Sequence, residues 1–177
     1  MLFRSTDEDK ESVLFMRGAM FERMKKYDES EAAFRKVLAL SPLHAGALNY
    51  LGYTLADRNL RLDEAYQLIR KAVDLDPDNG AYLDSLGWVY FRQGKLTDAE
   101  ASLIKAASHM DADPTVHDHL GDVYLKLAKT KEAIAQWTLS LKGFKDEFPS
   151  EVDPEEVSKV ATKLDAARVK LAQETKR

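Results

Sequence analysis

The chain has 177 residues, of which 45% are hydrophobic, and its formal net charge is −4. A chain of this size can bury one ordinary core, whereas its negative charge argues against nucleic acid as a partner, because phosphate binding needs a surplus of Lys and Arg on one face. The sequence contains no cysteine, which excludes disulfides, thiolate catalysis and cysteine metal sites. No apolar run approaches the roughly 18 residues of a membrane span, so we expect no direct membrane insertion.

Glycines recur at a regular interval along the chain. The spacings are 34, 35 and 34 residues, between Gly18, Gly52, Gly87 and Gly121. A small residue also recurs in each unit and is followed four positions later by a bulky one, which is Phe34, Ile69, Leu103 or Trp137. Apolar residues in both halves of each unit follow the three- and four-residue spacing of a helix. Each unit is therefore predicted to be a pair of helices.

This pattern resembles the tetratricopeptide repeat (TPR) family, whose unit is a helix–turn–helix of about 34 residues. The resemblance is carried by LGYTLADR, LDEAYQLIRKAVDLDPDN and LGWVYFRQGKLTDAEASLIKA, and it covers about residues 11 to 147. It implies an all-α, right-handed superhelical solenoid of four TPR units after an N-terminal extension at residues 1–10. The expected units are residues 11–44, 45–79, 80–113 and 114–147. Residues 48 to 100 also resemble the C-terminal part of bacterial multi-repeat TPR proteins, which leaves a cytoplasmic or a bacterial extracytoplasmic location open.

The first predicted helix, from about Lys10 to Lys25, is rich in apolar side chains. It displays more apolar surface than one neighbouring helix can cover, with Val13, Leu14, Phe15, Met16, Met20, Phe21 and Met24. We expect either that the chain is a piece of a longer array or that this face packs against something, which includes self-association.

The four recurring glycines are predicted to be structural. Glycine inside a helix costs about 1 kcal/mol relative to alanine, so its repetition indicates places where helices approach too closely for a side chain. Trp137 occupies the bulky position of the second helix and is expected in the core. Two pairs, Asp28 with Glu31 and Thr97 with Glu100, fit capping boxes at helix starts.

A separate stripe runs along the first helix of each unit, because one residue turns a helix by about 100°. In the family this stripe lines the concave groove, where extended peptides usually bind. The candidate groove residues are Asn49, Tyr53, Asp84, Trp88, Phe91, Asp118 and Asp122. We expect an aromatic platform, with Asn49 and Asp84 bonding a peptide backbone and the last two aspartates selecting positive charge. The alternative is that the aromatic residues only pack between successive first helices.

The run HDHLGD, residues 117 to 122, contains residue types that bind metals. His117 and His119 lie about 200° apart on one helix, so they cannot share an ion without distortion. We expect His117 in the core and His119 as a hydrogen-bond partner between helices. No phosphate loop, nucleophile elbow or dinucleotide fingerprint occurs. The sequence therefore predicts no enzyme, no cofactor and no metal.

Residues 154–174 are predicted to form a capping helix. Its apolar stripe consists of Val157, Val160, Ala161, Leu164, Ala167 and Leu171, and its other face is polar. A solenoid needs such a helix to cover its last exposed face. An amphipathic helix at a membrane surface is the alternative, but the segment lacks the large aromatic residues and strong basic face typical of that class.

Three functions remain open from the sequence. The first is a non-enzymatic protein–protein interaction scaffold that presents a concave, aromatic and partly acidic groove to a peptide or protein. The second is a structural or self-assembly segment of a longer bacterial TPR protein. The third is an accessory domain of an enzyme or secretion complex. The stripe lacks the basic residues with which some members of the family hold the C-terminal carboxylate of heat-shock chaperones, which argues against that role.

Overall fold

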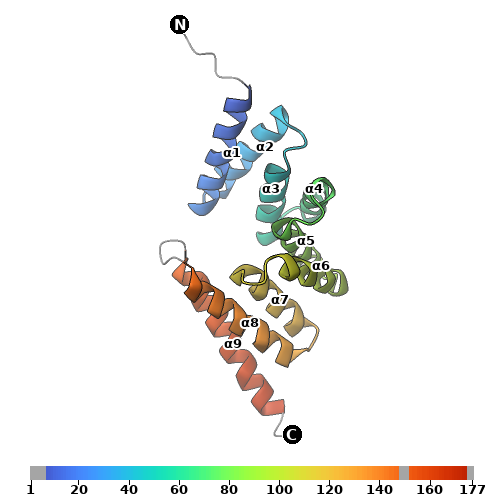
Figure 1. Ribbon diagram of the computed structural model, residues 1–177, viewed down its shortest axis with the longest axis vertical. Helices are drawn as coiled ribbons and strands as arrows, with labels where there is room; N and C mark the ends of the chain where they lie inside the picture. Colours follow the sequence, from blue (N-terminus) through green and yellow to red (C-terminus); the bar gives the residue numbers. More distant parts are fainter. Residues whose placement is uncertain (1–6, 148–151, 175–177) are drawn as a thin grey trace.

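The computed structural model describes residues 7–147 and 152–174, and within these ranges every regular element is a helix (Figure 1). The helices are α1 (Asp7–Arg23), α2 (Tyr27–Leu40), α3 (Ala45–Asp57), α4 (Leu62–Leu75), α5 (Gly80–Arg92), α6 (Leu96–His109), α7 (Pro114–Lys126), α8 (Thr130–Asp146) and α9 (Pro154–Glu174). Among these helices none is both long and apolar enough to cross a membrane.

The helices form four consecutive pairs that stack along the molecule. The closest packing is within the pairs α1–α2, α3–α4, α5–α6 and α7–α8, and each pair also packs on the next. Helix α9 packs on α8 at the end of the stack (Figure 1). The expected all-α repeat solenoid is thus confirmed. Helix α1 begins at Asp7, inside the segment expected as an extension at residues 1–10, and residues 1–6 lie outside the described ranges.

Each recurring glycine faces the bulky side chain of the second helix in its own pair. A methyl group on Gly87 would lie 2.5 Å from Cγ of Leu103 and 3.2 Å from the carbonyl oxygen of Ala99. The corresponding neighbours are Phe34 for Gly18, Ile69 for Gly52 and Trp137 for Gly121. All four bulky side chains are completely buried. The prediction that these glycines permit close helix packing is therefore confirmed.

The two capping boxes expected from the sequence are wrong. Helices α2 and α6 begin after Lys26 and Lys95, neither of which makes a side-chain capping bond, and Asp28 and Thr97 lie inside the first turn. The preceding first helices end instead with a residue in the left-handed conformation. The residue after it donates a backbone hydrogen bond to the carbonyl five positions earlier, as Lys95 N does to Tyr90 O at 2.9 Å. This Schellman-type ending leads directly into the next helix. Side-chain caps occur at α3, α5 and α7, where for example Asn79 accepts a bond from Tyr82 N.

The apolar core runs through the stack and continues into α9. Its last part joins Ala133 and Trp137 of α8 with three residues of α9, Val160, Leu164 and Ala167. The indole of Trp137 is completely buried, as expected for a core residue, and its Nε1 atom has no hydrogen-bond partner. Helix α9 therefore covers the apolar side of α8.

Candidate functional site

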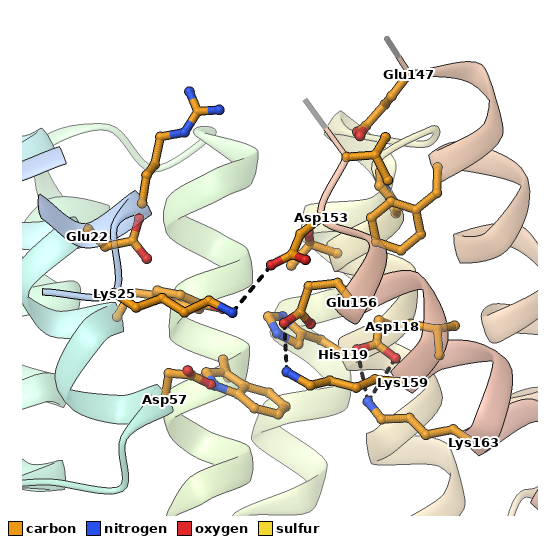
Figure 2. A pocket seen from close by; sticks show the side chains of 18 of the residues that line it. Glu22, Lys25, Asp57, Asp118, His119, Glu147, Asp153, Glu156, Lys159 and Lys163 are labelled. Atoms are coloured by element: carbon orange, nitrogen blue, oxygen red, sulfur yellow. Dashed lines mark hydrogen bonds and ion pairs between the residues drawn. The ribbon is translucent and has the colours of Figure 1, made fainter. Parts of the chain in front are cut away.

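A cavity of about 700 Å³ opens on the side of the solenoid formed by the first helices of the pairs. We call it the concave pocket. Side chains of α1, α3, α5 and α7 line it, together with the end of α8 and the first half of α9 (Figure 2). Glu22, Lys25 and Asp57 lie on one side of it, and Asp118, Lys159 and Lys163 lie on the other (Figure 2). The pocket is therefore bounded by residues from both ends of the chain.

Trp88 of α5 is built into the wall of the concave pocket. Its ring stacks on His119 with centroids 4.1 Å apart and on Phe91 with centroids 5.0 Å apart. Its Nε1 atom donates a hydrogen bond to Oδ1 of Asp57 at 3.2 Å, and only 7% of the residue is exposed. Trp88 thus packs between successive first helices, as one of the two alternatives expected, and it also lines the pocket.

Asp84 binds His119 inside the protein and does not line the concave pocket. Nδ1 of His119 lies 2.9 Å and 3.1 Å from the two carboxylate oxygens, and both residues are buried. Burial opposes protonation of His119, but the charges of Asp84 and then of Asp118 and Asp122 outweigh it and raise the pKa of the imidazole. The expected link by His119 between helices is confirmed. Asp84 has this structural role instead of the expected contact with a peptide backbone.

Asp118 and Asp122 share an ion pair with one lysine from α9. Nζ of Lys163 lies 2.9 Å from both carboxylate oxygens of Asp118 and 2.8 Å from Oδ2 of Asp122. Burial raises the pKa of Asp122, and the charge of Lys163 opposes this effect only in part. The two aspartates also outweigh the burial of Lys163 and raise the pKa of that lysine. The cation expected from a partner at this place is therefore supplied by the chain itself.

A different pair of carboxylates carries negative charge on the opposite wall. Glu22 of α1 and Asp57 of α3 both line the concave pocket (Figure 2). Burial, and then the charge of Asp57, raises the pKa of Glu22, while Arg23 opposes this effect. Tyr53 lines the same region, and burial together with Asp57 raises the pKa of its hydroxyl group well above the usual value. Glu22 and Asp57 are thus the carboxylates of the α1–α3 wall, which Arg23 and Lys25 also line.

An ion pair joins the two ends of the solenoid at the rim of the pocket. Nζ of Lys25, in the turn after α1, lies 2.9 Å from Oε2 of Glu155 and 3.5 Å from Oδ2 of Asp153. Figure 2 shows the second of these contacts reaching across the pocket. All three side chains remain substantially exposed, so the contact is weak by the standard of exposed ion pairs.

The seven candidate groove residues divide into two groups. Tyr53, Trp88 and Asp118 line the concave pocket, whereas Asn49, Asp84, Phe91 and Asp122 do not. Oδ1 of Asn49 is buried and has no hydrogen-bond partner. None of the seven candidates lies on α9, although side chains of α9 line the pocket. No pattern in the sequence shows which residues of α9 lie beside which residues of α7. Glu22 and Asp57 belong to the expected stripe, and their spacing could have identified them.

No group of three or more His, Asp and Glu side chains in the part of the chain that the structure describes is placed to hold a metal ion. Both ring nitrogens of His117 have partners of their own, namely Oε1 of Gln136 at 2.7 Å and the carbonyl oxygen of Asp111 at 2.8 Å. His119 is held by Asp84. The two histidines are therefore engaged in separate structural contacts.

Comparisons with known proteins agree with this architecture. The family model described as tetratricopeptide repeat matches residues 16–80 and 58–117. A search of curated proteins finds no significant match. Among solved structures, a mutant of the Thermobaculum terrenum O-GlcNAc transferase matches with 24% identity and a TM-score of 0.70, over 82% of this chain and 27% of the transferase chain. The chain thus spans about a quarter of that protein.

Two further bacterial structures match most of the chain. Pseudomonas aeruginosa pilF has 20% identity and a TM-score of 0.73, over 94% of this chain and 71% of its own. MamA residues 41 to the end, from Desulfovibrio magneticus RS-1, has 21% identity and a TM-score of 0.64, over 81% of this chain and 78% of its own. At these identities the likeness concerns the fold.

Proposed function

Since the chain belongs to the tetratricopeptide repeat family, we propose that it is a non-enzymatic scaffold whose concave pocket binds an extended segment of a protein partner. The observation that carries the proposal is the concave pocket itself, which is lined by the first helices of all four pairs and by α9. Repeat solenoids use extended concave surfaces of this kind for binding.

The wall of the concave pocket is already ordered without a partner. Trp88 is held on its faces by His119 and Phe91 and at its ring nitrogen by Asp57. A binding surface whose side chains are fixed in advance loses little conformational entropy on association. The ordering cost of binding therefore falls mainly on the partner segment.

The α1–α3 wall favours a positively charged group on the partner. Glu22 and Asp57 are carboxylates that line the concave pocket, and burial raises the pKa of Glu22. A cation placed between two such carboxylates would offset both their desolvation and their mutual repulsion. On the opposite wall Lys163 already forms ion pairs with Asp118 and Asp122. We therefore place a lysine or arginine side chain of the partner against the α1–α3 wall.

A displayed library of random peptides tests this function directly. We expect the wild-type chain to enrich peptides that contain Lys or Arg, and Glu22→Lys to abolish this enrichment because it reverses the charge of the wall. The matched control is Glu29→Lys on the exposed surface of α2, outside the pocket, which should enrich the same peptides as the wild type. Far-UV circular dichroism and thermal melting confirm that the variants remain folded.

Two results of this selection would contradict the proposal. If the wild-type chain enriches no peptide class, the concave pocket is not a peptide-binding site. If Glu22→Lys enriches the same basic peptides as the wild type, the α1–α3 wall does not select positive charge.

A further inference from the structure

The outer face of α1 is an apolar surface that no other described part of the chain covers. Val13, Met16, Met20 and Met24 are 58%, 62%, 51% and 52% exposed, and their spacing of three or four residues places them on one side of the helix. Beside them lies a shallow apolar hollow of about 490 Å³, lined by Phe15, Met16, Ala19, Met20, Arg23 and Met24. Figure 1 shows α1 at the end of the stack. A contiguous apolar patch of this kind marks an interaction site.

We propose that this face is the interface of a homodimer, in which α1 of one copy packs antiparallel on α1 of a second copy, with the two-fold axis near Met16. The proposal concerns a surface outside the concave pocket, although Arg23 borders both. The methionines suit such a contact because their flexible side chains adapt to an irregular partner surface.

The distribution of charge along α1 selects a second copy as the occupant. The exposed N-terminal end of the helix carries Glu8 and Asp9, and the exposed C-terminal end carries Arg23 and is followed by Lys26. An antiparallel arrangement places the acidic end of each helix against the basic end of the other. The face is thus complementary to itself, as a two-fold symmetric interface requires.

The positions of two charges locate the symmetry axis. Asp9 and Arg23 lie seven residues before and seven residues after Met16, and both project within about 20° of it around the helix. A two-fold axis at Met16 therefore sets Asp9 opposite Arg23 of the second copy, and it sets Val13 close to Met20. A parallel pair would instead oppose like charges at both ends, which is unfavourable.

The size of the surface predicts a weak dimer. One helical face from each copy falls at the low end of specific interfaces, below about 1,200 Å² of total buried area. Association should therefore depend on protein concentration, and both forms should be present in the micromolar range. Of the residues that line the α1 hollow, only Arg23 also lines the concave pocket, so separate variants can test the pocket and the α1 face.

Sedimentation equilibrium over a range of concentrations tests the interface. We expect a reversible monomer–dimer equilibrium for the wild type and a weakening of association by about tenfold or more for Met16→Ser/Met20→Ser, which removes apolar contacts worth more than 1.4 kcal/mol. Ile104→Ser is the matched control, because Ile104 is 50% exposed on α6, and it should dimerise like the wild type. A wild type that stays monomeric at the highest concentration, or a dimer unaffected by the double substitution, overturns the proposal.

A charge exchange tests the antiparallel orientation. Asp9→Arg and Arg23→Asp should each weaken the dimer, because each sets like charges opposite one another across the interface. The combined variant Asp9→Arg/Arg23→Asp should restore association to within about threefold of the wild type, since the pairs form again with opposite polarity. Failure of the combined variant to recover overturns the antiparallel arrangement.

Cross-linking tests the position of the axis independently of affinity. The chain contains no cysteine, so Met16→Cys provides a single thiol on each copy. A short bis-maleimide reagent should link Met16→Cys into covalent dimers, whereas Ile104→Cys should remain largely unlinked. Equal yields of covalent dimer from the two variants would show that the axis does not pass near Met16.

Discussion

At the scale of single residues, the turn inside each helix pair requires an unusual backbone conformation. Lys25, Asn59, Gly94 and Ala128 occupy equivalent places and have φ angles of 57°, 54°, 77° and 59°. Residues with a side chain pay about 1–2 kcal/mol for this left-handed region, whereas glycine adopts it freely. The third pair therefore has the relaxed form of the turn, whereas Lys25 and Ala128 carry backbone strain there, and Asn59 carries less because asparagine tolerates this conformation better.

This difference predicts opposite effects for two simple substitutions. Ala128→Gly should raise the free energy of unfolding by up to about 1 kcal/mol, because it relieves backbone strain at an exposed residue. Gly94→Ala should lower it by about 1 kcal/mol, although a methyl group there would meet no atom within 4 Å. Urea denaturation measures both changes. A loss of stability in Ala128→Gly would contradict the strain argument.

At the scale of elements, buried charges hold neighbouring first helices in place. The pair formed by Asp84 of α5 and His119 of α7 is buried under the ring of Trp88. Lys163 similarly joins α9 to α7 through Asp118 and Asp122. Removing one member of such a pair leaves an uncompensated charge inside the protein, which is costly. These contacts therefore determine the register of α5, α7 and α9 along the wall of the concave pocket.

The His119 contact predicts a pH dependence of stability. The folded protein raises the pKa of His119, mainly because Asp84 outweighs the effect of burial. The contact therefore contributes its full stabilisation at pH values below about 6.5, the pKa of histidine in the unfolded chain. This stabilisation is lost as the pH rises through the pKa of His119 in the folded protein. We expect the free energy of unfolding, measured by urea denaturation at a series of pH values, to fall across this window. His119→Gln should lack this fall, and an unchanged slope in that variant would refute the assignment.

At the scale of the whole molecule, the ends of the solenoid meet across the mouth of the concave pocket. Lys25 forms ion pairs with Asp153 and Glu155, which lie more than a hundred residues later in the sequence. Figure 1 shows the C-terminal end of α1 facing the N-terminal end of α9. Each repeat contacts only its neighbours in an ordinary solenoid, so such molecules bend easily along their length. The ion pair links the first and last parts of the pocket, and we expect it to restrain the opening of the pocket.

Reversing the charge of Lys25 should widen the pocket. Spin labels at Glu29→Cys on α2 and Ser158→Cys on α9 report the distance between the two walls. We expect Lys25→Glu to lengthen and broaden this distance distribution, because the new carboxylate repels Asp153 and Glu155. Lys26→Glu changes the neighbouring exposed lysine and should leave the distribution as it is in the labelled wild type. Identical distributions for Lys25→Glu and the wild type would show that the ion pair does not restrain the pocket.

The sequence by itself determined the repeat, the helix pairs and the structural role of the glycines. These properties follow from local periodicity, since Gly87 and Leu103 lie at the same positions of the repeat as Gly18 and Phe34. Helical geometry sets which residues of each first helix share a face, and the resemblance to the family indicated that this face lines the groove. Tyr53 and Trp88 were placed at the pocket for this reason.

Only the tertiary structure decided which charges of that face remain available for binding. Asp84 is hydrogen-bonded to a histidine 35 residues away, and Asp118 is paired with a lysine 45 residues away, so neither presents the free carboxylate that its sequence position suggested. Glu22 and Asp57 remain on the pocket wall. The physical reason is that the state of a charge depends on the groups within a few ångströms of it, and these groups come from helices whose relative register no local pattern encodes.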